Sequence, residues 1–184
     1  MTTSAVKSRK FSILFDWFDQ GKDGQLTQDD LLAMAGLFAM VADNDPASTA
    51  AMRDAFEQWW QLLLKHGDTD GDGQVSRAEF IAAMEANVTS PEHFSGAILA
   101  IADATMQALD TDGDGVLSRD EYVGMAGRLG VSPVNSAAGF EKLDRDGDGV
   151  ISHEEYRQAI SEFYLSADLD APGNWLLGPL DQSV

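Results

Sequence analysis

Three twelve-residue segments of this chain repeat one pattern of acidic residues, and they constrain its fold more than any other feature. The segments cover residues 68–79, 110–121 and 144–155. Each carries Asp at positions 1, 3 and 5, Gly at position 6, an aliphatic residue at position 8 and Glu at position 12. Because three copies share one spacing, we interpret them as loops that perform the same task.

The alternating carboxylates indicate that each loop wraps a divalent cation in the manner of an EF-hand. Ca²⁺ takes about six to eight oxygens, which three Asp, one backbone carbonyl at position 7 and a bidentate Glu supply. Glycine at position 6 permits the sharp turn that brings the later ligands round, where a Cβ would clash. The predicted metal ligands are Asp68, Asp70, Asp72, Gln74 and Glu79, then Asp110, Asp112, Asp114, Val116 and Glu121, and finally Asp144, Asp146, Asp148, Val150 and Glu155.

Two further positions of each loop have expected roles. The aliphatic residue at position 8 is expected to point into the core and to pair through its backbone with position 8 of a neighbouring loop. Serine at position 9 is expected to meet the ion through a water molecule. These residues are Val75, Leu117 and Ile151 at position 8, and Ser76, Ser118 and Ser152 at position 9.

A fourth, weaker copy covers residues 19–30. It keeps Asp19 at position 1, Asp23 at position 5 and a glycine at position 6, but it has Gly21 at position 3 and Asp30 at position 12. Because Asp is one methylene shorter than Glu, a bidentate grip on the ion is harder, and the loop should be weaker or favour Mg²⁺. The sequence leaves open whether this loop binds Ca²⁺, binds Mg²⁺ or serves only to pair with the second loop.

The charge of the chain follows from these loops and excludes several classes of partner. The formal net charge is −19, and Lys plus Arg number only 12. Nucleic acid and anionic membrane surfaces both require a basic surface, so neither is an expected partner. The chain has no cysteine, so a disulfide, a thiolate metal site and a redox role are excluded.

No sequence signal places the chain in or on a membrane. The first ten residues are polar and lack an apolar signal-peptide core, residue 2 is not the glycine that myristoylation requires, and no stretch reaches the ~20 apolar residues that span a bilayer. We therefore expect a soluble, cytoplasmic protein.

Apolar residues at helical spacing flank every loop, which predicts an all-α protein of four helix–loop–helix hands. One hand cannot bury its apolar face alone, so hands one and two should pair, as should hands three and four. We predict an N-terminal pair over residues 1–87, a C-terminal pair over 88–164 and a tail over 165–184. The inner helix faces are expected to carry Phe11, Leu14, Phe15, Phe18, Leu31, Met34, Ala35, Met52, Phe56, Trp59, Trp60, Leu63, Leu64, Phe80, Met84, Phe94, Ile98, Ile101, Thr105, Leu109, Tyr122, Met125, Ala126, Phe140, Leu143, Tyr156, Ala159, Ile160 and Phe163.

Glycine and proline mark the expected helix ends. Residues 43–46 form a predicted turn, and Gly67 should let the preceding helix bend or end early. Ser90 and Pro91 are predicted as the N-cap and first residue of the next helix. Residues 129–133 are predicted to end one helix at a glycine and start another at Ser-Pro.

The tail carries a turn signal at residues 170–174, followed at once by Trp175, Leu176 and Leu177. A disordered acidic tail does not normally carry three large apolar residues in a row. We predict that the tail folds back and buries them against the helices. The alternative is a short exposed interaction motif.

The whole chain resembles the sarcoplasmic calcium-binding protein family, and within it the bacterial calerythrin type. The resemblance rests on four hands in about 180 residues, long aromatic-rich inner helices and the Ala-Pro-Gly-Asn-Trp-Leu tail. It implies a compact cytosolic globule of two EF-hand pairs with a folded-back tail and no catalytic activity. It also implies that two or three of the four sites bind Ca²⁺, and the first loop is the one that departs from the pattern.

Three functions are compatible with the sequence. The first is a monomeric Ca²⁺ buffer or signal modulator, with Mg²⁺ as a competitor and no required protein target. The second is a Ca²⁺ sensor that opens a groove for a target protein, although the scattered methionines do not favour it. The third is a ligand-binding or luminescent relative with an aromatic cavity, which Trp17, Trp59, Trp60 and Tyr164 would line. No nucleophile–base pair or phosphate-binding loop suggests an enzyme.

Overall fold

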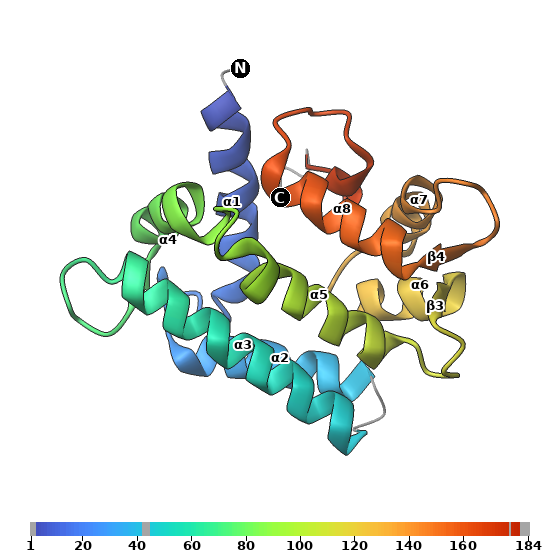
Figure 1. Ribbon diagram of the computed structural model, residues 1–184, viewed down its shortest axis with the longest axis horizontal. Coiled ribbons are helices and arrows are strands. Elements are labelled where there is room, and N and C mark those ends of the chain that lie inside the picture. The colour runs from blue at the N-terminus through green and yellow to red at the C-terminus, as the bar shows by residue number, and fades with distance from the viewer. Residues whose placement is uncertain (1–2, 42–44, 177, 181–184) are drawn as a thin grey trace.

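The computed structural model describes residues 3–41, 45–176 and 178–180, and it confirms the all-α prediction. Helices are joined by loops, and the loops carry two short strand pairs (Figure 1). In chain order the elements are α1 (Thr3–Phe18), β1 (Gln25–Leu26), α2 (Gln28–Val41), α3 (Pro46–Gly67), β2 (Val75–Ser76), α4 (Arg77–Ala83), the π-helical turn η1 (Met84–Val88), α5 (Phe94–Leu109), β3 (Val116–Ser118), α6 (Arg119–Arg128), α7 (Pro133–Leu143), β4 (Val150–Ser152), α8 (His153–Leu165) and the 3₁₀ turn η2 (Pro172–Trp175).

Side chains that satisfy free backbone groups fix where the helices begin. A serine caps each helix that leaves a strong loop: Ser76, Ser118 and Ser152. In each case the side chain of the Glu three residues later accepts a hydrogen bond from the backbone N–H of the serine. Pro46 and Pro133 occupy the first turns of α3 and α7, where a missing N–H costs nothing. The predicted helix start at Ser132–Pro133 is therefore confirmed.

The loops pair as predicted. β1 pairs antiparallel with β2, and β3 pairs antiparallel with β4. Leu26 lies opposite Val75, and Leu117 lies opposite Ile151, so position 8 of each loop meets position 8 of its partner. All four side chains are fully buried. Each strand pair thus ties two loops together at the point where they face the core.

One continuous apolar core runs through both EF-hand pairs. α5 crosses the centre of the molecule and packs on α3 on one side and α8 on the other (Figure 1). Aromatic rings fill the N-terminal half, where the centroids of Phe18 and Trp59 lie 4.7 Å apart and those of Phe15 and Phe80 lie 5.7 Å apart. Of the inner-face residues predicted above, only Leu64 and Ile101 are partly rather than fully buried.

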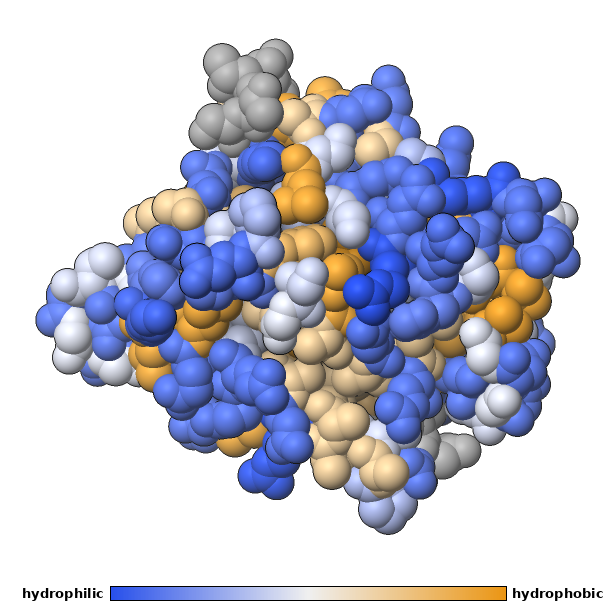
Figure 2. Space-filling view, in the orientation of Figure 1, coloured by the Kyte–Doolittle hydropathy of each residue, from blue (hydrophilic) through white to orange (hydrophobic). Residues whose placement is uncertain are grey.

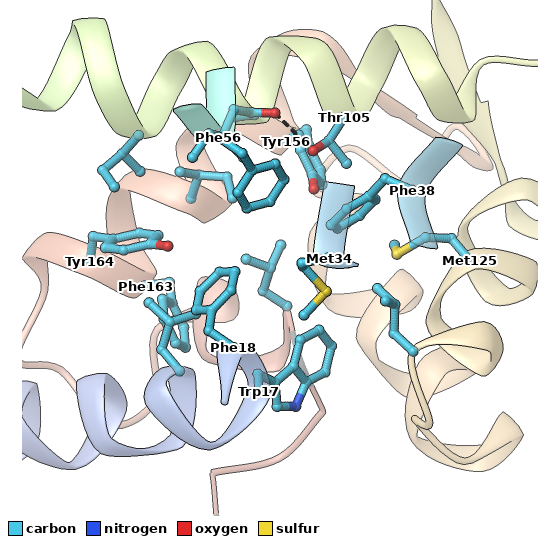
Figure 3. A pocket seen from close by; sticks show the side chains of 17 residues that line it. Trp17, Phe18, Met34, Phe38, Phe56, Thr105, Met125, Tyr156, Phe163 and Tyr164 are labelled. Carbon is cyan, nitrogen blue, oxygen red and sulfur yellow. Dashed lines mark hydrogen bonds between the residues drawn. The ribbon is translucent and has the colours of Figure 1, made fainter. Parts of the chain in front are cut away.

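A small apolar cavity lies at the centre of this core (Figure 3). Its volume is about 70 Å³, and its wall includes Trp17, Tyr156 and Tyr164. Burial raises the pKa of both tyrosines, so their hydroxyls stay protonated. Trp59 and Trp60 are buried elsewhere in the core and do not line the cavity, so of the four aromatic residues considered for a ligand cavity only Trp17 and Tyr164 line it.

One helix shows no early end where it was expected, and one predicted helix start is wrong. α3 ends at Gly67, directly before the loop, and the backbone N–H of Asp68 still donates to Leu64 O at 3.3 Å. The site is tightly packed, because a Cβ on Gly67 would lie 3.2 Å from Val75 Cγ1. α5 starts at Phe94 rather than Pro91, after a turn. Residues 43 and 44 of the turn predicted at 43–46 lie outside the described residues.

A buried lysine connects the first and last helices. Lys10 is fully buried, and its Nζ donates to Glu162 O at 3.3 Å and to Ser166 O at 3.0 Å, at the C-terminal end of α8. Its ammonium also lies 5.7 Å from the ring centroid of Phe163. A cation at a helix C-terminus is stabilised by the negative end of the helix dipole and by the carbonyls exposed there. Burial lowers the pKa of Lys10 to about 8.

The visible surface is largely polar. Most of the face shown in Figure 2 is hydrophilic, and strongly hydrophobic residues occur there in separate small groups. Among the described residues, no helix combines the length and the apolar character needed to cross a bilayer.

Candidate metal centres

The Asp at position 1 shapes each loop by accepting hydrogen bonds from its backbone. In the third loop, Asp110 Oδ1 accepts from the N–H groups of Gly113 at 2.8 Å and Asp114 at 3.1 Å, and Asp110 Oδ2 accepts from Gly115 N at 2.9 Å. The second loop repeats these three bonds on Asp68. In the fourth loop, Asp144 accepts from Gly147 and Gly149. The backbone therefore closes around the side chain that begins each loop.

Left-handed backbone at positions 4 and 6 lets each loop turn. In the third loop, Gly113 has φ +76° and Gly115 has φ +86°. Glycine adopts these angles at no steric cost, whereas other residues are strained there. The sequence reasoning used position 6 but missed position 4, although glycine occupies position 4 in all three strong loops.

The Glu at position 12 is held by four hydrogen bonds in the second and third loops. Glu121 Oε1 accepts from Thr111 N and Oγ1, both at 2.7 Å, and its Oε2 accepts from Ser118 N at 2.9 Å and Oγ at 2.8 Å. Burial acts to raise the pKa of Glu121, but the bonds from Thr111 and Ser118 together lower it. The equivalent bonds, led by that from the Thr69 hydroxyl, lower the pKa of Glu79 to about 2. Both carboxylates are therefore ionised at neutral pH.

Each strong loop gathers carboxylate oxygens into a space that suits a hard cation. In each of three groups, one oxygen from every member lies within 4.8 Å of the others. Ca²⁺ binds oxygen at about 2.3–2.6 Å, so oxygens around one ion lie within roughly 5 Å of each other. The donor set and its spacing therefore fit Ca²⁺. The groups are Asp68, Asp70 and Asp72; Asp110, Asp112 and Glu121; and Asp144, Asp146 and Glu155.

The other predicted ligands lie in the same loops but outside these groups. Glu79 is hydrogen-bonded to positions 2 and 9 of its own loop. Asp114 and Asp148 each accept from the backbone N–H two residues on, at 3.0 Å, and so orient the residue predicted to offer its carbonyl. Those residues are Val116 and Val150, with Gln74 held in the same way by Asp72. Their roles as ligands stay predictions.

The first loop folds like the others, but its backbone is more strained and it has fewer carboxylates in place for an ion. Asp19 is buried and accepts from Asp23 N at 3.2 Å and Gly24 N at 3.0 Å. Asp30 Oδ1 accepts from two backbone N–H groups, and its Oδ2 accepts from the backbone and hydroxyl of Thr27. Lys22 takes position 4 with φ +53°, a strained angle for a residue other than glycine. Among the described residues, no three-carboxylate group is found in this loop.

Sequence reasoning also missed two sets of contacts. Position 2 holds the Glu of its loop, through the hydroxyls of Thr69 and Thr111. Their recurrence in two loops was a signal for that role. Position 10 of every loop contacts the entering helix of the partner hand, which no local pattern reveals. These contacts are Gln28 to Glu57, Arg77 to Asp16, Arg119 to Glu141 and His153 to Asp103.

Position 9 has a structural role that the sequence reasoning did not assign. The hydroxyl of Ser118 donates to Glu121 Oε2 at 2.8 Å and accepts from Glu121 N at 3.4 Å. The same pair of bonds links Ser76 to Glu79 and Ser152 to Glu155. The predicted water-mediated contact with the ion stays a prediction.

Family models match most of the loops and their helices. A model described as an EF-hand domain pair matches residues 10–85, and a model described as an EF hand matches residues 101–125 and 137–161. A comparison with curated proteins finds no significant match.

Solved structures of similar fold span nearly the whole chain. A calcium-binding protein of Streptomyces coelicolor is 24% identical with a TM-score of 0.74, covering 88% of this chain and 99% of that one. The amphioxus sarcoplasmic calcium-binding protein is 18% identical with a TM-score of 0.73, covering 94% and 96%. The coelenterazine-binding protein of Renilla muelleri is 21% identical with a TM-score of 0.69, covering 97% and 99%.

Proposed function

The chain belongs to the EF-hand family of calcium-binding proteins, and from that premise we propose that it is a Ca²⁺ buffer or signal modulator whose second, third and fourth loops are the ion sites. A bound ion would neutralise the crowded carboxylates of each loop. The proposed ligands are the acidic residues at positions 1, 3, 5 and 12 and the carbonyl at position 7. Loops of this type reach Kd values on the order of 10⁻⁹ to 10⁻⁶ M.

We favour a buffer over a sensor because of one observation. The three oxygen groups that suit Ca²⁺ occur together with an apolar core that has no open groove in the described part of the chain. Sensors expose a methionine-rich groove when their loops are filled. Of the six described methionines, Met40 is exposed and the other five are buried in the core that both EF-hand pairs share: Met34, Met52, Met84, Met106 and Met125. Tail residue Leu176 is buried against the same core. A target helix would first have to displace this packing.

A role as carrier of a large aromatic ligand is not supported by the size of the cavity. Ligand pockets usually measure about 300–1,000 Å³. The central cavity measures about 70 Å³, so it admits no multi-ring molecule unless the core expands. The EF-hand models and the calcium-binding proteins of similar fold agree with the expectation that the chain is not an enzyme.

The proposal includes an organisation into three parts. Residues 1–87 form the N-terminal pair, residues 88–164 the C-terminal pair and residues 165–184 the tail. The two separate strand pairs support this division, because each joins loops of one pair only. A monomeric state and a cytoplasmic location are also proposed, and light scattering and cell fractionation test them.

Calorimetry together with an apolar-surface dye tests the function. We expect three ions per chain, weaker apparent affinity in millimolar Mg²⁺, and little dye binding in Ca²⁺. Strong dye binding in Ca²⁺ but not in chelator would favour the sensor. A chain that binds no Ca²⁺ would refute both roles.

A further inference from the structure

The C-terminal segment of residues 166–176 packs closely on α8. After α8 ends at Leu165, the chain turns back, and η2 lies against both α7 and α8 (Figure 1). Ala171, Asn174 and Leu176 are buried there. Leu176 also forms part of the wall of the central cavity. The segment therefore closes one side of the core. The predicted burial of the tail is confirmed for Leu176, whereas Trp175 is only partly buried and Leu177 lies outside the described residues.

Gly173 shows how closely the segment fits. A Cβ at this position would lie 2.2 Å from Ala159 O and 2.8 Å from Glu162 Cβ. The backbone at residue 173 therefore lies directly on α8, and only glycine fits without displacement. Gly139 on α7 is tight as well, since a Cβ there would lie 3.0 Å from Trp175 O.

A series of three contacts links the C-terminal segment to the fourth loop. Glu162 Oε2 accepts from Gly173 N at 3.0 Å and from Arg145 Nη2 at 2.7 Å. Arg145 is position 2 of the fourth loop, and its backbone N donates to Glu155 Oε1 at 2.7 Å. The Arg145 and Glu162 side chains are only 25% and 22% exposed, so the ion pair is partly shielded from water. A proposed ion ligand is thus three contacts from the C-terminal segment.

The fourth loop differs from the other two at this position. Thr69 and Thr111 hold position 2 in the second and third loops and use their hydroxyls to bind the Glu of their own loop. Arg145 instead sends its side chain out to α8. Its contact with its own Glu is made by the backbone. Only the fourth loop therefore couples position 2 to a neighbouring segment through a charged side chain.

The other polar contacts of the segment do not pass through a calcium loop, and one of them is the bond from Lys10 Nζ to Ser166 O at 3.0 Å. Asn174 Nδ2 donates to Asp168 O and Leu169 O, both inside the segment. Its buried Oδ1 has no hydrogen-bond partner among the described residues, which costs stability. The bond from the Tyr122 hydroxyl to Leu176 O is long, at 3.4 Å. Arg9 donates to Leu180 O further along the chain.

We propose that residues 166–176 form a C-terminal latch, whose closed position depends on calcium in the fourth loop through the Arg145–Glu162 ion pair. This rests on the proposed function, because the fourth loop must bind the ion. An ion in the loop fixes the backbone of Arg145. Its guanidinium then holds the Glu162 carboxylate in the position where it accepts the hydrogen bond from Gly173 N. An empty loop frees Arg145, the latch opens, and the cavity wall formed by Leu176 is lost.

Hydrogen exchange of the latch amides, measured with Ca²⁺ and with chelator, tests the proposal. In the wild type we expect these amides to exchange about tenfold faster in chelator, the effect of losing one charge-assisted hydrogen bond. Arg145→Ala should keep the number of bound ions and bring exchange in Ca²⁺ to the chelator rate. The matched control is Arg119→Ala, which removes the exposed Arg119–Glu141 pair of the third loop and should leave latch exchange unchanged.

A second variant opens the latch without touching the loop. Gly173→Ala should give fast latch exchange in both conditions while all ions still bind. Equal latch exchange with and without Ca²⁺ in the wild type, or wild-type exchange in Arg145→Ala, overturns the latch. Glu155→Gln separates the two proposals, because an unchanged number of bound ions in that variant contradicts calcium binding by the fourth loop rather than the latch alone.

Discussion

The Glu at position 12 of the third loop gives a direct test of the proposed ion sites. Glu121 accepts four hydrogen bonds, two on each oxygen, from Thr111 and Ser118. Glutamine keeps only one carbonyl oxygen, so in Glu121→Gln the new NH₂ group faces donors. A hydroxyl can rotate to accept from it, but a backbone N–H cannot.

The expected loss has a calcium-independent and a calcium-dependent part. An unsatisfied donor costs about 1–3 kcal/mol. Because this site is partly exposed, we expect Glu121→Gln to lose about 1–2 kcal/mol of unfolding free energy in chelator. In Ca²⁺ at a hundredfold above Kd, the variant also loses about 2.7 kcal/mol of linkage from its site. The total loss in Ca²⁺ is therefore about 3.7–4.7 kcal/mol.

Urea unfolding in Ca²⁺ and in chelator measures both parts, and calorimetry should show one ion fewer per chain. Glu141→Gln is the control, because its exposed pair with Arg119 should change stability by less than about 1 kcal/mol in either condition. If Glu121→Gln gains as much stability from Ca²⁺ as the wild type does, Glu121 is not a ligand.

Three further outcomes follow from the structure. Chelation should lower the melting temperature strongly, because three sites at a hundredfold over Kd together contribute roughly 8 kcal/mol; equal melting temperatures with and without Ca²⁺ would contradict the linkage. Gly21→Asp should raise the ion affinity of the first loop, since a Cβ there lies 3.7 Å from Asp23 Cγ and 3.8 Å from Asp30 Oδ1, and an unchanged calorimetric isotherm would argue against it. Burial lowers the pKa of Lys10 from 10.5 to about 8, so above pH 8 the unfolded chain binds more protons than the folded one, and stability should rise by about 2 kcal/mol towards pH 9.5. Urea unfolding across this range should show that Lys10→Met lacks the rise; an equal rise in both proteins assigns it to other groups.

Much of the fold was predictable because its signals are local. Carboxylates at fixed spacing and apolar residues at helical spacing each act over a few residues, and they located the loops, most of the helices and the pairing of position 8 between neighbouring loops. The clustering of oxygens in the three strong loops follows from the same short-range pattern.

What the sequence did not reveal depends on contacts between distant segments. Gly67 suggested an early helix end, and nothing near it in the sequence indicated its close approach to Val75 and Ala83. Nothing near Lys10 indicated that it would bind the C-terminal end of α8. The partner of Arg145 lies on a helix seventeen positions later. No periodicity or spacing encodes these partners.

The strand shared by the first two loops makes one hand dependent on the other. The first loop lacks a three-carboxylate group among the described residues, yet its Leu26 is fixed by Val75 of a loop that has one. If the second, third and fourth loops bind Ca²⁺ as proposed, loss of one ion would loosen both N-terminal hands together, whereas the C-terminal pair would have to release two ions. As the Ca²⁺ concentration falls, the two EF-hand pairs should therefore loosen at different concentrations. The whole protein would then respond over a wider range of Ca²⁺ concentration than any single site.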